Sequence, residues 1–580
     1  MEWSDGASEG TDVKSTGESG TAKFLRVDGD GTCSWQVPPD TNTQLTLIDE
    51  DNMASNDATK PPSQQSVKAY VDALSTAPEI TGTASGSIGA NKGVAVKSDG
   101  TLEEITATIT FNDPLQSRSS MVTDLGGWST GTSEFVQLVY HVAENRYYGI
   151  WNHTGGQGYE STGTPAADGT VTWSNYRAIG PSNIQEQFAF YDSTSERIVW
   201  IYKKDNVNGV FSRVVYWDSS NNRAETGSED QVYTAQVAPG IRGCQCGDRV
   251  AATFERNAGY YAMRLCVGTV NASTNRITWG SNANNWSTDG DGIEHAINSD
   301  VVWDAGNSRV VCVGRVYGSD TFSSSSWTGI AAVGSLSGSG TSAAATFGSM
   351  VAIQGNGINT QSPTTYYDSA NGKIVVTYID HNYSTDQYVV SGQVGTVSGT
   401  SISFGSVART GVKASDKGDA VYNPITGLGS TGWRQQSTNY WWVMSTSVSG
   451  TTLTFEAETK PSGGSVEIGP ETNYHCISGD YDSTLQRTIW FVSEDSNKSP
   501  DFSWTKNGTK TTNSGNAIGF NKTAVTNGQT ATVAVTGNTS TQSSLTSATK
   551  YYFNMDGTLG TDSTKPYAGI ALSSTKLLIK

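Results

Sequence analysis

The phrase YYDSANGKIVVTYI, residues 366–379, decides the fold of this chain, because the chain repeats it. Each copy reads as an apolar strand, a polar turn and a second apolar strand, which is the pattern of a β-hairpin. The closer copies are FYDSTSERIVWIY (190–202), VVWDAGNSRVVCV (301–313) and GDYDSTLQRTIWFV (479–492). The looser copies are LVYHVAENRYYGIW (138–151), AATFERNAGYYAM (251–263) and AVYNPITGLGSTGW (420–433).

The turn of this hairpin carries a charge pattern. An Asp follows the first strand and a cation comes five residues later in four copies: Asp192 with Arg197, Asp304 with Arg309, Asp368 with Lys373 and Asp482 with Arg487. His141 and Arg146 keep the same spacing. An Asp side chain can accept hydrogen bonds from the turn backbone two residues on, and we expect the cation opposite it in the ladder to pair with its charge.

The spacing of the copies predicts the architecture. The turn aromatics or their equivalents lie 49 to 64 residues apart, at Tyr140, Tyr191, Phe254, Trp303, Tyr367, Tyr422 and Tyr481. A second phrase, VGTVSGTSISFGS at 394–406, recurs in most units and predicts an outer hairpin. Two hairpins make a four-stranded blade, which cannot bury its apolar face without a neighbour. The chain is therefore predicted to be all-β with a seven-bladed β-propeller; six blades is the alternative, because the copies at Phe254 and Tyr422 are degenerate.

The sequence divides into four predicted segments. Residues 1–60 predict a small N-terminal β head, with two short strands around the Asp28–Gly29–Asp30–Gly31 turn. Residues 61–103 predict a short helix, with Ser63 as its N-cap, followed by a β linker. Residues 104–510 predict the propeller, and TLEEITATITF from Thr101 is expected to lend a strand to the last blade. Residues 511–580 predict a separate small C-terminal β-domain with DG and NG turns.

Composition excludes some classes of function. The formal net charge of −18, with no basic cluster, argues against a nucleic-acid partner. The sequence has no apolar run of about 18 residues, so no membrane insertion is predicted, and the start MEWSDGASEGTD has none of the features of a signal peptide. Six cysteines in 580 residues are too few for a disulfide scaffold, so we expect folding in a reducing cytoplasm.

No catalytic, cofactor-binding or metal-binding residues are predicted, and the ligand-binding residues are left open. A propeller glycosidase needs paired carboxylates or a Tyr nucleophile, and the S-x-D-x-G-x-x-W box of sialidase blades is absent. Cysteine spacing at Cys244, Cys246 and Cys266, with His295 beyond, does not fit a zinc site. The turns Asp28–Gly31 and Asp289–Gly292 lack the ligands of a calcium loop.

Two aromatic features have competing interpretations. The dipeptide Trp303–Asp304 is interpreted as a strand end, because the other WD40 signatures are missing. The side chains of Trp286, Trp433 and Tyr440–Trp442 would stack on sugar rings if exposed, but filling the interfaces between blades is the preferred interpretation.

The N-terminal stretch LTLIDEDNMASNDATKPPSQQSVKAYVDA, residues 45–73, resembles a segment common in structural and tail-fibre proteins of tailed bacteriophages, particularly those of marine bacteria. There a DDM-AS phrase and a QQS-x-KAYVDA phrase precede the fibre body, and Asn52 departs from the pattern. TAKFLRVDGDGTCSWQVP (21–38) resembles a short fibre module, and the stretch from Gly528 to Lys580 resembles a β-module that ends many phage fibre proteins.

The resemblance implies a non-enzymatic virion protein, similar to a tail fibre, made in the host cytoplasm without a signal peptide. Residues 1–75 would attach to other virion proteins, the Ser63–Leu74 helix would form a homo-oligomer such as a trimer, and the propeller would recognise a host-surface glycan or protein. One alternative is a purely structural tail nozzle, neck or capsid-vertex decoration protein. A second alternative is a hydrolase of host polysaccharide.

Overall fold

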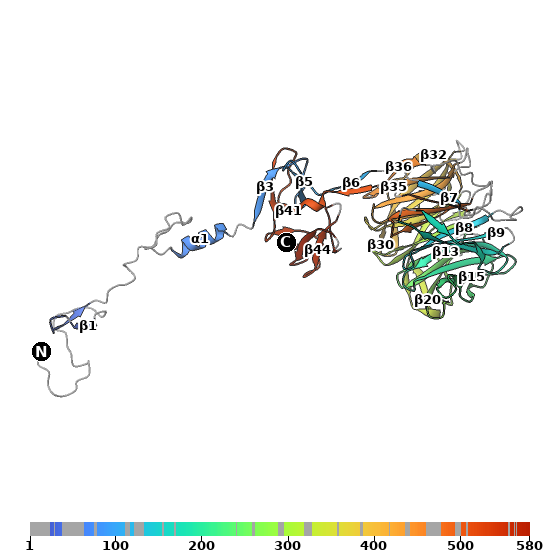
Figure 1. Ribbon diagram of the computed structural model, residues 1–580, viewed down its shortest axis with the longest axis horizontal. Helices are drawn as coiled ribbons and strands as arrows, with labels where there is room; N and C mark the ends of the chain where they lie inside the picture. Colours follow the sequence, from blue (N-terminus) through green and yellow to red (C-terminus); the bar gives the residue numbers. More distant parts are fainter. Residues whose placement is uncertain are drawn as a thin grey trace, which may run out of the picture. The chain divides into compact units, whose positions relative to one another are not determined.

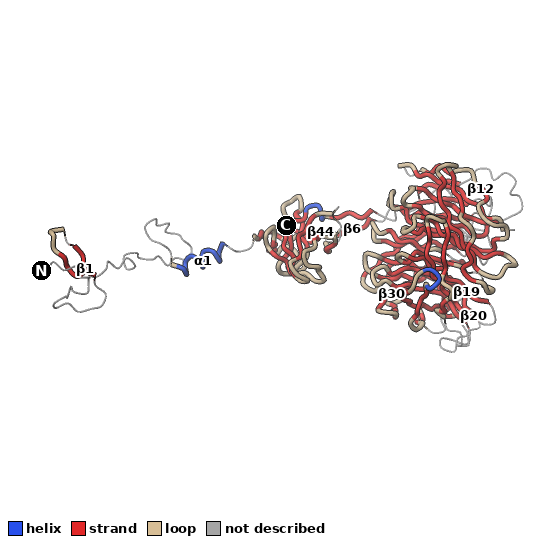
Figure 2. The backbone as a smooth tube through the Cα atoms, turned by 90° about the horizontal axis from the view of Figure 1, so that it is seen from below, coloured by secondary structure: helices blue, strands red, loops and turns tan. Residues whose placement is uncertain are grey.

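The computed structural model describes most of the chain, in two compact units that are treated separately below. One unit runs from Thr108 to Thr511, and the other combines Met1–Ala107 with Thr512–Lys580 (Figures 1 and 2). The described residues are 24–27, 29–36, 63–74, 78–110, 116–120, 133–153, 156–167, 170–238, 240–257, 261–287, 295–317, 327–355, 359–382, 387–416, 418–435, 441–459, 477–493, 500–505, 509–554, 557–561, 563 and 565–580.

The unit from Thr108 to Thr511 is a closed ring of seven antiparallel blades, of which blades 4 to 6 are hydrogen-bonded to one another in a single 14-stranded sheet. The innermost strand of each blade contacts the innermost strand of the next, and the last contacts the first. These inner strands are β8 (Ser133–His141), β13 (Ile184–Asp192), β18 (Arg242–Cys246), β23 (His295–Asp304), β28 (Asn359–Asp368), β33 (Ala420–Asn423) and β37 (Ile477–Asp482). The prediction of a seven-bladed β-propeller is confirmed, and the six-bladed alternative is wrong.

Each blade adds outer strands to its inner strand in chain order. Blades 1 to 3 add β9 (Arg146–His153), β10 (Gly158–Pro165), β11 (Val171–Trp173) and β12 (Arg177–Ala178); β14 (Arg197–Lys204), β15 (Val210–Asp218), β16 (Arg223–Thr226) and β17 (Asp230–Tyr233); and β19 (Arg249–Asn257), β20 (Tyr261–Asn271), β21 (Arg276–Trp279) and β22 (Asn284–Asn285). Blades 4 to 6 add β24 (Arg309–Tyr317), β25 (Thr328–Ser337), β26 (Ala344–Phe347) and β27 (Val351–Ala352); β29 (Lys373–Asn382), β30 (Gln387–Ser398), β31 (Ser401–Phe404) and β32 (Ala408–Asp416); and β34 (Leu428–Gln435), β35 (Trp441–Ser449) and β36 (Thr452–Thr459).

The seventh blade takes its fourth strand from the other end of the propeller sequence. Its strands β37, β38 (Arg487–Ser493) and β39 (Pro500–Thr505) come from one segment, and β7 (Gln116–Ser120) pairs with β39. The expected closing device is therefore present, but the predicted residues were wrong. The stretch from Thr101 instead forms β5 (Leu102–Glu104), which pairs with β4, and β6 (Ala107–Thr110), which pairs with β40 (Thr509–Thr512).

Blade 3 also differs from its prediction. Phe254 lies inside the second strand, β19, and the residue at the turn of the inner hairpin is Gln245. The turn there is only Gly247–Asp248. The next hairpin, β19 to β20, has the same apolar–polar–apolar pattern, and the pattern alone does not tell a blade's first turn from its second.

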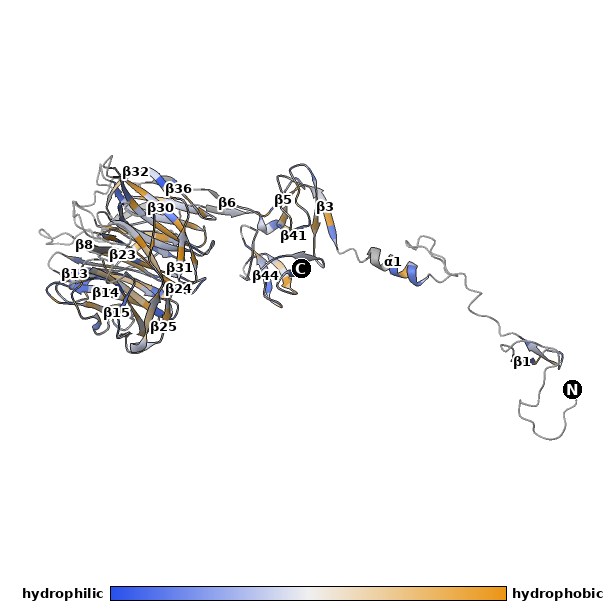
Figure 3. Ribbon diagram, turned by 180° about the vertical axis from the view of Figure 1, so that it is seen from behind, coloured by the Kyte–Doolittle hydropathy of each residue, from blue (hydrophilic) through white to orange (hydrophobic). Residues whose placement is uncertain are grey.

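The core of the propeller lies between blades. Val311 and Val313 of blade 4 are fully buried against Ile374 and Val376 of blade 5. Burying one such side chain contributes about 1.5–3 kcal/mol. Apolar residues, orange in Figure 3, lie along the propeller strands, as expected where each blade covers its neighbour.

The smaller unit contains two five-stranded sheets built from both ends of the chain. The first has the order β3 (Glu79–Thr83), β42 (Thr530–Ala534), β41 (Ala517–Asn521), β4 (Gly93–Val96) and β5; the second has β43 (Thr539–Thr541), β47 (Lys576–Ile579), β46 (Tyr567–Ala571), β44 (Lys550–Phe553) and β45 (Leu559–Gly560). Phe520 and Phe553 pack between them, with ring centroids 5.0 Å apart. The predicted linker (61–103) and C-terminal domain (511–580) thus share one core, because β4 pairs with β41 and β3 with β42.

The N-terminal elements agree with their predictions where they are described. Strands β1 (Phe24–Val27) and β2 (Cys33–Gln36) pair around the predicted turn, of which Asp28 lies outside the described residues. Helix α1 (Gln64–Leu74) begins after Ser63, whose Oγ accepts the Ser66 N–H at 2.9 Å, so Ser63 is the N-cap. No helix among the described residues is both long and apolar enough to cross a membrane.

Candidate functional site

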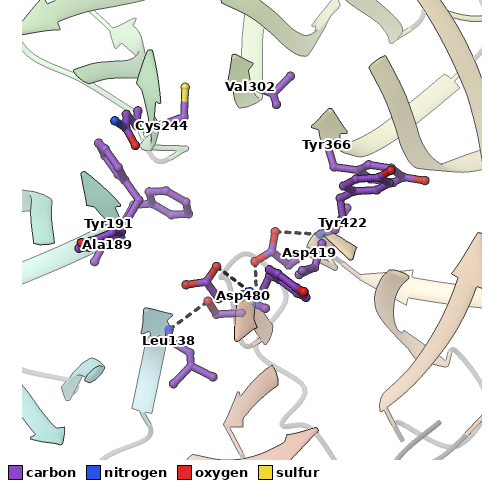
Figure 4. A pocket seen from close by; sticks show the side chains of 18 of the residues that line it. Leu138, Ala189, Tyr191, Cys244, Val302, Tyr366, Asp419, Tyr422 and Asp480 are labelled. Atoms are coloured by element: carbon purple, nitrogen blue, oxygen red, sulfur yellow. Dashed lines mark hydrogen bonds between the residues drawn. The ribbon is translucent and has the colours of Figure 1, made fainter. Parts of the chain in front are cut away.

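The centre of the propeller holds a cavity of about 420 Å³, a size typical of small-molecule sites. All seven inner hairpins line it. Val142, which follows β8, lines the cavity and is 48% exposed, so the cavity opens to solvent at the end of the channel where the inner hairpins turn. Figure 4 shows this opening with strand ends arranged around it.

Three aspartates line the cavity: Asp300, Asp419 and Asp480. Asp300 accepts the N–H of Val301 and the N–H of Thr365 in the next blade, both at 2.8 Å. Each carboxylate thus joins neighbouring blades through the channel-facing N–H groups of their inner strands.

The other two aspartates repeat this arrangement. Asp419 accepts from Ala420 and from Gly479 of blade 7, both at 2.9 Å. Asp480 accepts from Tyr481 and from Tyr140 of blade 1, both at 2.7 Å. Figure 4 draws Asp419 and Asp480 at the same side of the opening.

Burial makes these carboxylates unusually basic. It raises the pKa of Asp480 to about 7 and that of Asp300 to about 6, and it raises the pKa of Asp419 as well. The negative charge of Asp419 adds to the rise at the other two, whereas the Arg242 guanidinium lowers the pKa of Asp300. The cavity is therefore electronegative and holds carboxyls that titrate near neutral pH.

Aromatic rings form the walls and rim of the cavity. Tyr366 and Tyr422 stack with ring centroids 5.8 Å apart and interplanar angle 16°, as Figure 4 also shows. At the rim, the turn aromatics clamp the preceding blade. Tyr367 Oη accepts the Gly306 N–H and Tyr422 Oη accepts the Ala370 N–H, both at 3.1 Å. The aromatic that marks the repeat in the sequence therefore joins blades as well as filling space.

Two polar groups in the cavity wall, the Gln137 amide and the Tyr481 hydroxyl, have no hydrogen-bond partner among the described residues. Gln137 of β8 lines the cavity and is only 2% exposed. Within the part of the chain that the structure describes, nothing hydrogen-bonds its side-chain amide. By contrast, Gln187 on the neighbouring strand is fully engaged: its Nε2 donates to Phe135 O and its Oε1 accepts from Trp200 Nε1, both at 3.0 Å.

The turn aspartates are structural, as predicted. Asp368 Oδ1 accepts the N–H groups of Ala370 and Asn371 at 3.0 and 3.1 Å. The corresponding bonds at the other turns go from Thr194 to Asp192, from Asn307 to Asp304, and from Thr484 and Leu485 to Asp482.

The predicted charge pairing at these turns is mostly wrong. Among the described residues, only Asp482 and Arg487 form the ion pair, with 3.2 Å between Oδ2 and Nε. Elsewhere the cation reaches other groups: Arg197 Nε donates to Asn275 in blade 3, and Arg309 Nε donates to Gly399 O in blade 5. The aspartates are occupied by turn amides, which leaves the longer cations to fasten adjacent blades.

The Asp482–Arg487 pair lies at the seam where blade 7 meets blade 1. Both side chains are buried, at 0% and 1% exposure. Arg487 Nη2 donates to the Tyr147 hydroxyl of blade 1 at 2.6 Å, and that hydroxyl donates to Asp482. Burial raises the pKa of Tyr147 far above its usual range, so the hydroxyl keeps its proton.

The remaining candidates from the sequence lie in the core or outside the described residues. Trp286, Trp433 and Trp441 are buried, which favours the packing interpretation over sugar stacking; Tyr440 is not described. Cys244 and Cys246 are free thiols with sulfur atoms 3.4 Å apart. Among the described residues, no group of three or more His, Cys, Asp or Glu side chains is arranged to hold a metal ion. The Asp289–Gly292 turn lies outside the described residues.

The sequence analysis did not find the cavity residues, although a signal exists. Counting three residues back from each turn residue at 140, 191, 245, 303, 367, 422 and 481 gives Gln137, Phe188, Arg242, Asp300, Thr364, Asp419 and Ser478. Six of these seven are polar, in strands that are otherwise largely apolar. Four of the six polar residues line the cavity (Gln137, Asp300, Asp419 and Ser478), and Arg242 lies 4.0 Å from Asp300.

Comparison with known proteins gives a weak likeness of fold. No family model matches the sequence, and no curated protein matches it. Among solved structures, the chain is similar to a mutant of AofleA from Arthrobotrys oligospora (10% identity, 64% of this chain and 96% of that chain, TM-score 0.34) and to polysaccharide lyase Uly1 (8% identity, 68% and 99%, TM-score 0.38). It is also similar to Trypanosoma rangeli sialidase (10% identity, TM-score 0.35), covering 59% of this chain and 56% of the sialidase's length. At these scores the likenesses carry no argument about function, and the propeller assignment rests on the strand topology.

Proposed function

We propose that this chain is a non-enzymatic virion component of a tailed phage, similar to a tail fibre, whose propeller recognises the host surface. Residues 1–75 attach it to other virion proteins, and the Ser63–Leu74 helix joins copies of the chain. The resemblance of residues 45–73 to phage fibre proteins supports the virion assignment.

One observation carries the choice of binding over catalysis. Both oxygens of every cavity aspartate accept backbone N–H groups from two inner strands. A general acid or base must exchange its proton with substrate, whereas two N–H groups fix each of these carboxylates in place, which suits them to accept hydrogen bonds from a bound molecule. A rigid ring with an open polar cavity suits recognition, and several copies on one particle would amplify weak single-site binding.

The test uses labelled full-length protein and bacterial cells. We expect saturable binding to cells of the host and none to cells of an unrelated species, together with antibody labelling of the tail or another appendage on intact particles. Labelling of particles without any binding to host cells would favour the structural alternative, a nozzle, neck or vertex protein. Absence from the particle would overturn the virion assignment.

A hydrolase is the second candidate, because Asp480 has a pKa of about 7 inside a cavity. A carboxyl that is protonated near neutral pH is what a glycosidase uses as its general acid. Release of reducing sugar from host envelope by wild-type protein, and its loss in Asp480→Asn at a temperature where the variant remains folded, would establish this activity. We expect no release.

A further inference from the structure

In each blade, the residue three positions before the turn residue of the inner hairpin occupies an equivalent position in the channel. At this position Asp300 and Asp419 accept the N–H of a cavity-facing residue in the next blade, and Ser478 Oγ accepts the Leu138 N–H of blade 1 at 3.1 Å. Gln137 occupies the same position in blade 1. No hydrogen bond joins its side chain to Ala189, the equivalent residue of blade 2, within the described chain.

The amide atoms of Gln137 are not among the fully buried atoms that lack a partner, so they are accessible from the cavity. Gln137 lines the cavity, and the cavity is open at the rim beside Val142. A ligand that enters the cavity can therefore replace solvent as the hydrogen-bond partner of this amide. The Gln137 side chain offers both a donor and an acceptor.

The rest of the cavity wall restricts the chemistry of that molecule. Asp300, Asp419 and Asp480 present carboxylate oxygens, each of which has one further lone pair after accepting its backbone N–H. They can accept hydrogen bonds from hydroxyl or ammonium groups, and they repel anions. The stacked rings of Tyr366 and Tyr422 add an apolar wall that suits the C–H face of a sugar or a cation.

We propose that the central channel binds a sugar residue that is neutral or carries a free amine, with hydroxyl or ammonium donors on Asp419 and Asp480 and a hydrogen bond to Gln137. Acidic sugars are disfavoured, because the charged forms of the three carboxyls repel anions and outnumber the Arg242 guanidinium beside Asp300. This inference rests on the proposed recognition function and names its ligand class.

Because Asp480 and Asp300 titrate near pH 7 and 6, an amino sugar and a neutral sugar differ in their pH response. As the pH rises from about 5.5 and the carboxyls lose protons, binding of an ammonium group strengthens until the sugar amine loses its own proton. Neutral sugars change much less over this range. The dependence of affinity on pH therefore distinguishes an amino sugar from a neutral sugar.

The test is a titration of full-length protein with glucosamine oligomers, N-acetylglucosamine and glucose oligomers, and sialyl and uronic oligosaccharides, read by calorimetry. We expect binding of a neutral or amino saccharide and none of an acidic one. Gln137→Leu should weaken that binding by at least about five-fold through loss of its hydrogen bonds, with a melting temperature that is unchanged or higher.

Gln187→Leu is the matched control, because Gln187 is buried on the next strand with its amide engaged by the protein. It should lower the melting temperature and leave the affinity unchanged. Val142→Trp, at the exposed rim, should obstruct entry without disturbing the core. Preference for an acidic saccharide, unchanged affinity in Gln137→Leu and Val142→Trp, or no saccharide binding at millimolar concentration would each overturn the inference.

The outcomes also separate this site from the proposed function. Saccharide binding that depends on Gln137, with no binding to host cells, would leave the channel site standing and remove the recognition role. Binding to host cells that the saccharide does not compete, and that Gln137→Leu does not change, would leave the recognition role and remove the channel site.

Discussion

Asp482 occupies a turn position that four blades share, yet only in blade 7 does its carboxylate meet a buried guanidinium. This ion pair differs from the other turns because of a residue in the neighbouring blade. Tyr147 of blade 1 reaches across the seam and hydrogen-bonds both members of the pair. A charge pair with its own hydrogen-bonding partner tolerates burial, whereas breaking it leaves one uncompensated charge.

Arg487→Met should therefore lower the free energy of unfolding by about 3–5 kcal/mol, because Asp482 would remain buried without its cation. Lys373→Met at the same repeat position is the control. Lys373 donates to Thr396 and forms no ion pair with Asp368 among the described residues, so its loss should change stability by less than about 1 kcal/mol. Urea denaturation of both variants measures the difference, and equal losses would show that the seam pair has no special role.

Asp480 and Asp300 predict a pH dependence of stability. Their folded pKa values of about 7 and about 6 lie above the value of about 3.9 for an unfolded Asp. Their protonated forms favour the folded chain, so this contribution is full below about pH 4 and is lost as the pH rises through about 6 and 7. Between pH 5.5 and 8 the melting temperature should fall as the pH rises.

The matching control for this prediction is Asp480→Asn, which removes one titrating group. Its melting temperature should depend less steeply on pH over the same interval, measured by scanning calorimetry in buffers of equal ionic strength. Identical slopes for wild type and variant would show that Asp480 does not titrate there.

At the scale of elements, hairpins were predictable because an apolar strand, an Asx turn and a second apolar strand are all local features. The turn positions at Tyr140, Tyr191, Trp303, Tyr367 and Tyr481 follow from that pattern alone. Phe254 was assigned wrongly because every hairpin in a blade shares the pattern. The cavity position was missed for a different reason: one polar residue in an apolar strand has no meaning until seven strands converge on one axis.

Strand β7 closes the ring, and its pairing with β39 gives a sharp test. Successive residues of an edge strand direct their N–H groups alternately to the neighbouring strand and to solvent. Ser119 and Ser120 pair in regular register with Phe502 and Asp501. Of Ser119→Pro and Ser120→Pro, one should therefore remove a ladder hydrogen bond and destabilise blade 7 by about 3 kcal/mol, and the other should be tolerated. Thermal denaturation of both variants provides the measurement, and tolerance of both would mean that β7 contributes little to closure.

At the scale of the whole molecule, the least predictable feature was which segments of the chain make up the smaller unit. Local patterns identified strands in residues 79–103 and 517–580, but strand pairing between segments more than 400 residues apart leaves no local signal. The pairs β3 with β42 and β4 with β41 unite them. The local patterns therefore predicted a separate linker (61–103) and C-terminal domain (511–580), whereas in the structure strands from both segments form one unit.

A fragment containing only residues 512–580 should not fold, because β41 and β42 lose their partners and Phe520 loses part of its core. Joining residues 78–107 to that fragment through a flexible linker should restore cooperative unfolding, and residues 108–511 alone should unfold cooperatively as a propeller. Thermal unfolding followed by circular dichroism, and the dispersion of amide proton chemical shifts in NMR spectra, measure whether each fragment is folded. A cooperative transition in the 512–580 fragment would contradict the shared core.

Segments on both sides of the propeller build the smaller unit. This arrangement affects how the propeller can be replaced during evolution. The chain leaves that unit along β6 and returns along β40, two strands that pair with each other. The propeller is therefore a single insertion, and its two ends lie side by side because β6 and β40 pair. A different domain can be inserted between β6 and β40 while every strand pairing of the small unit is kept, so one recombination step can replace the whole propeller without altering the unit that carries it.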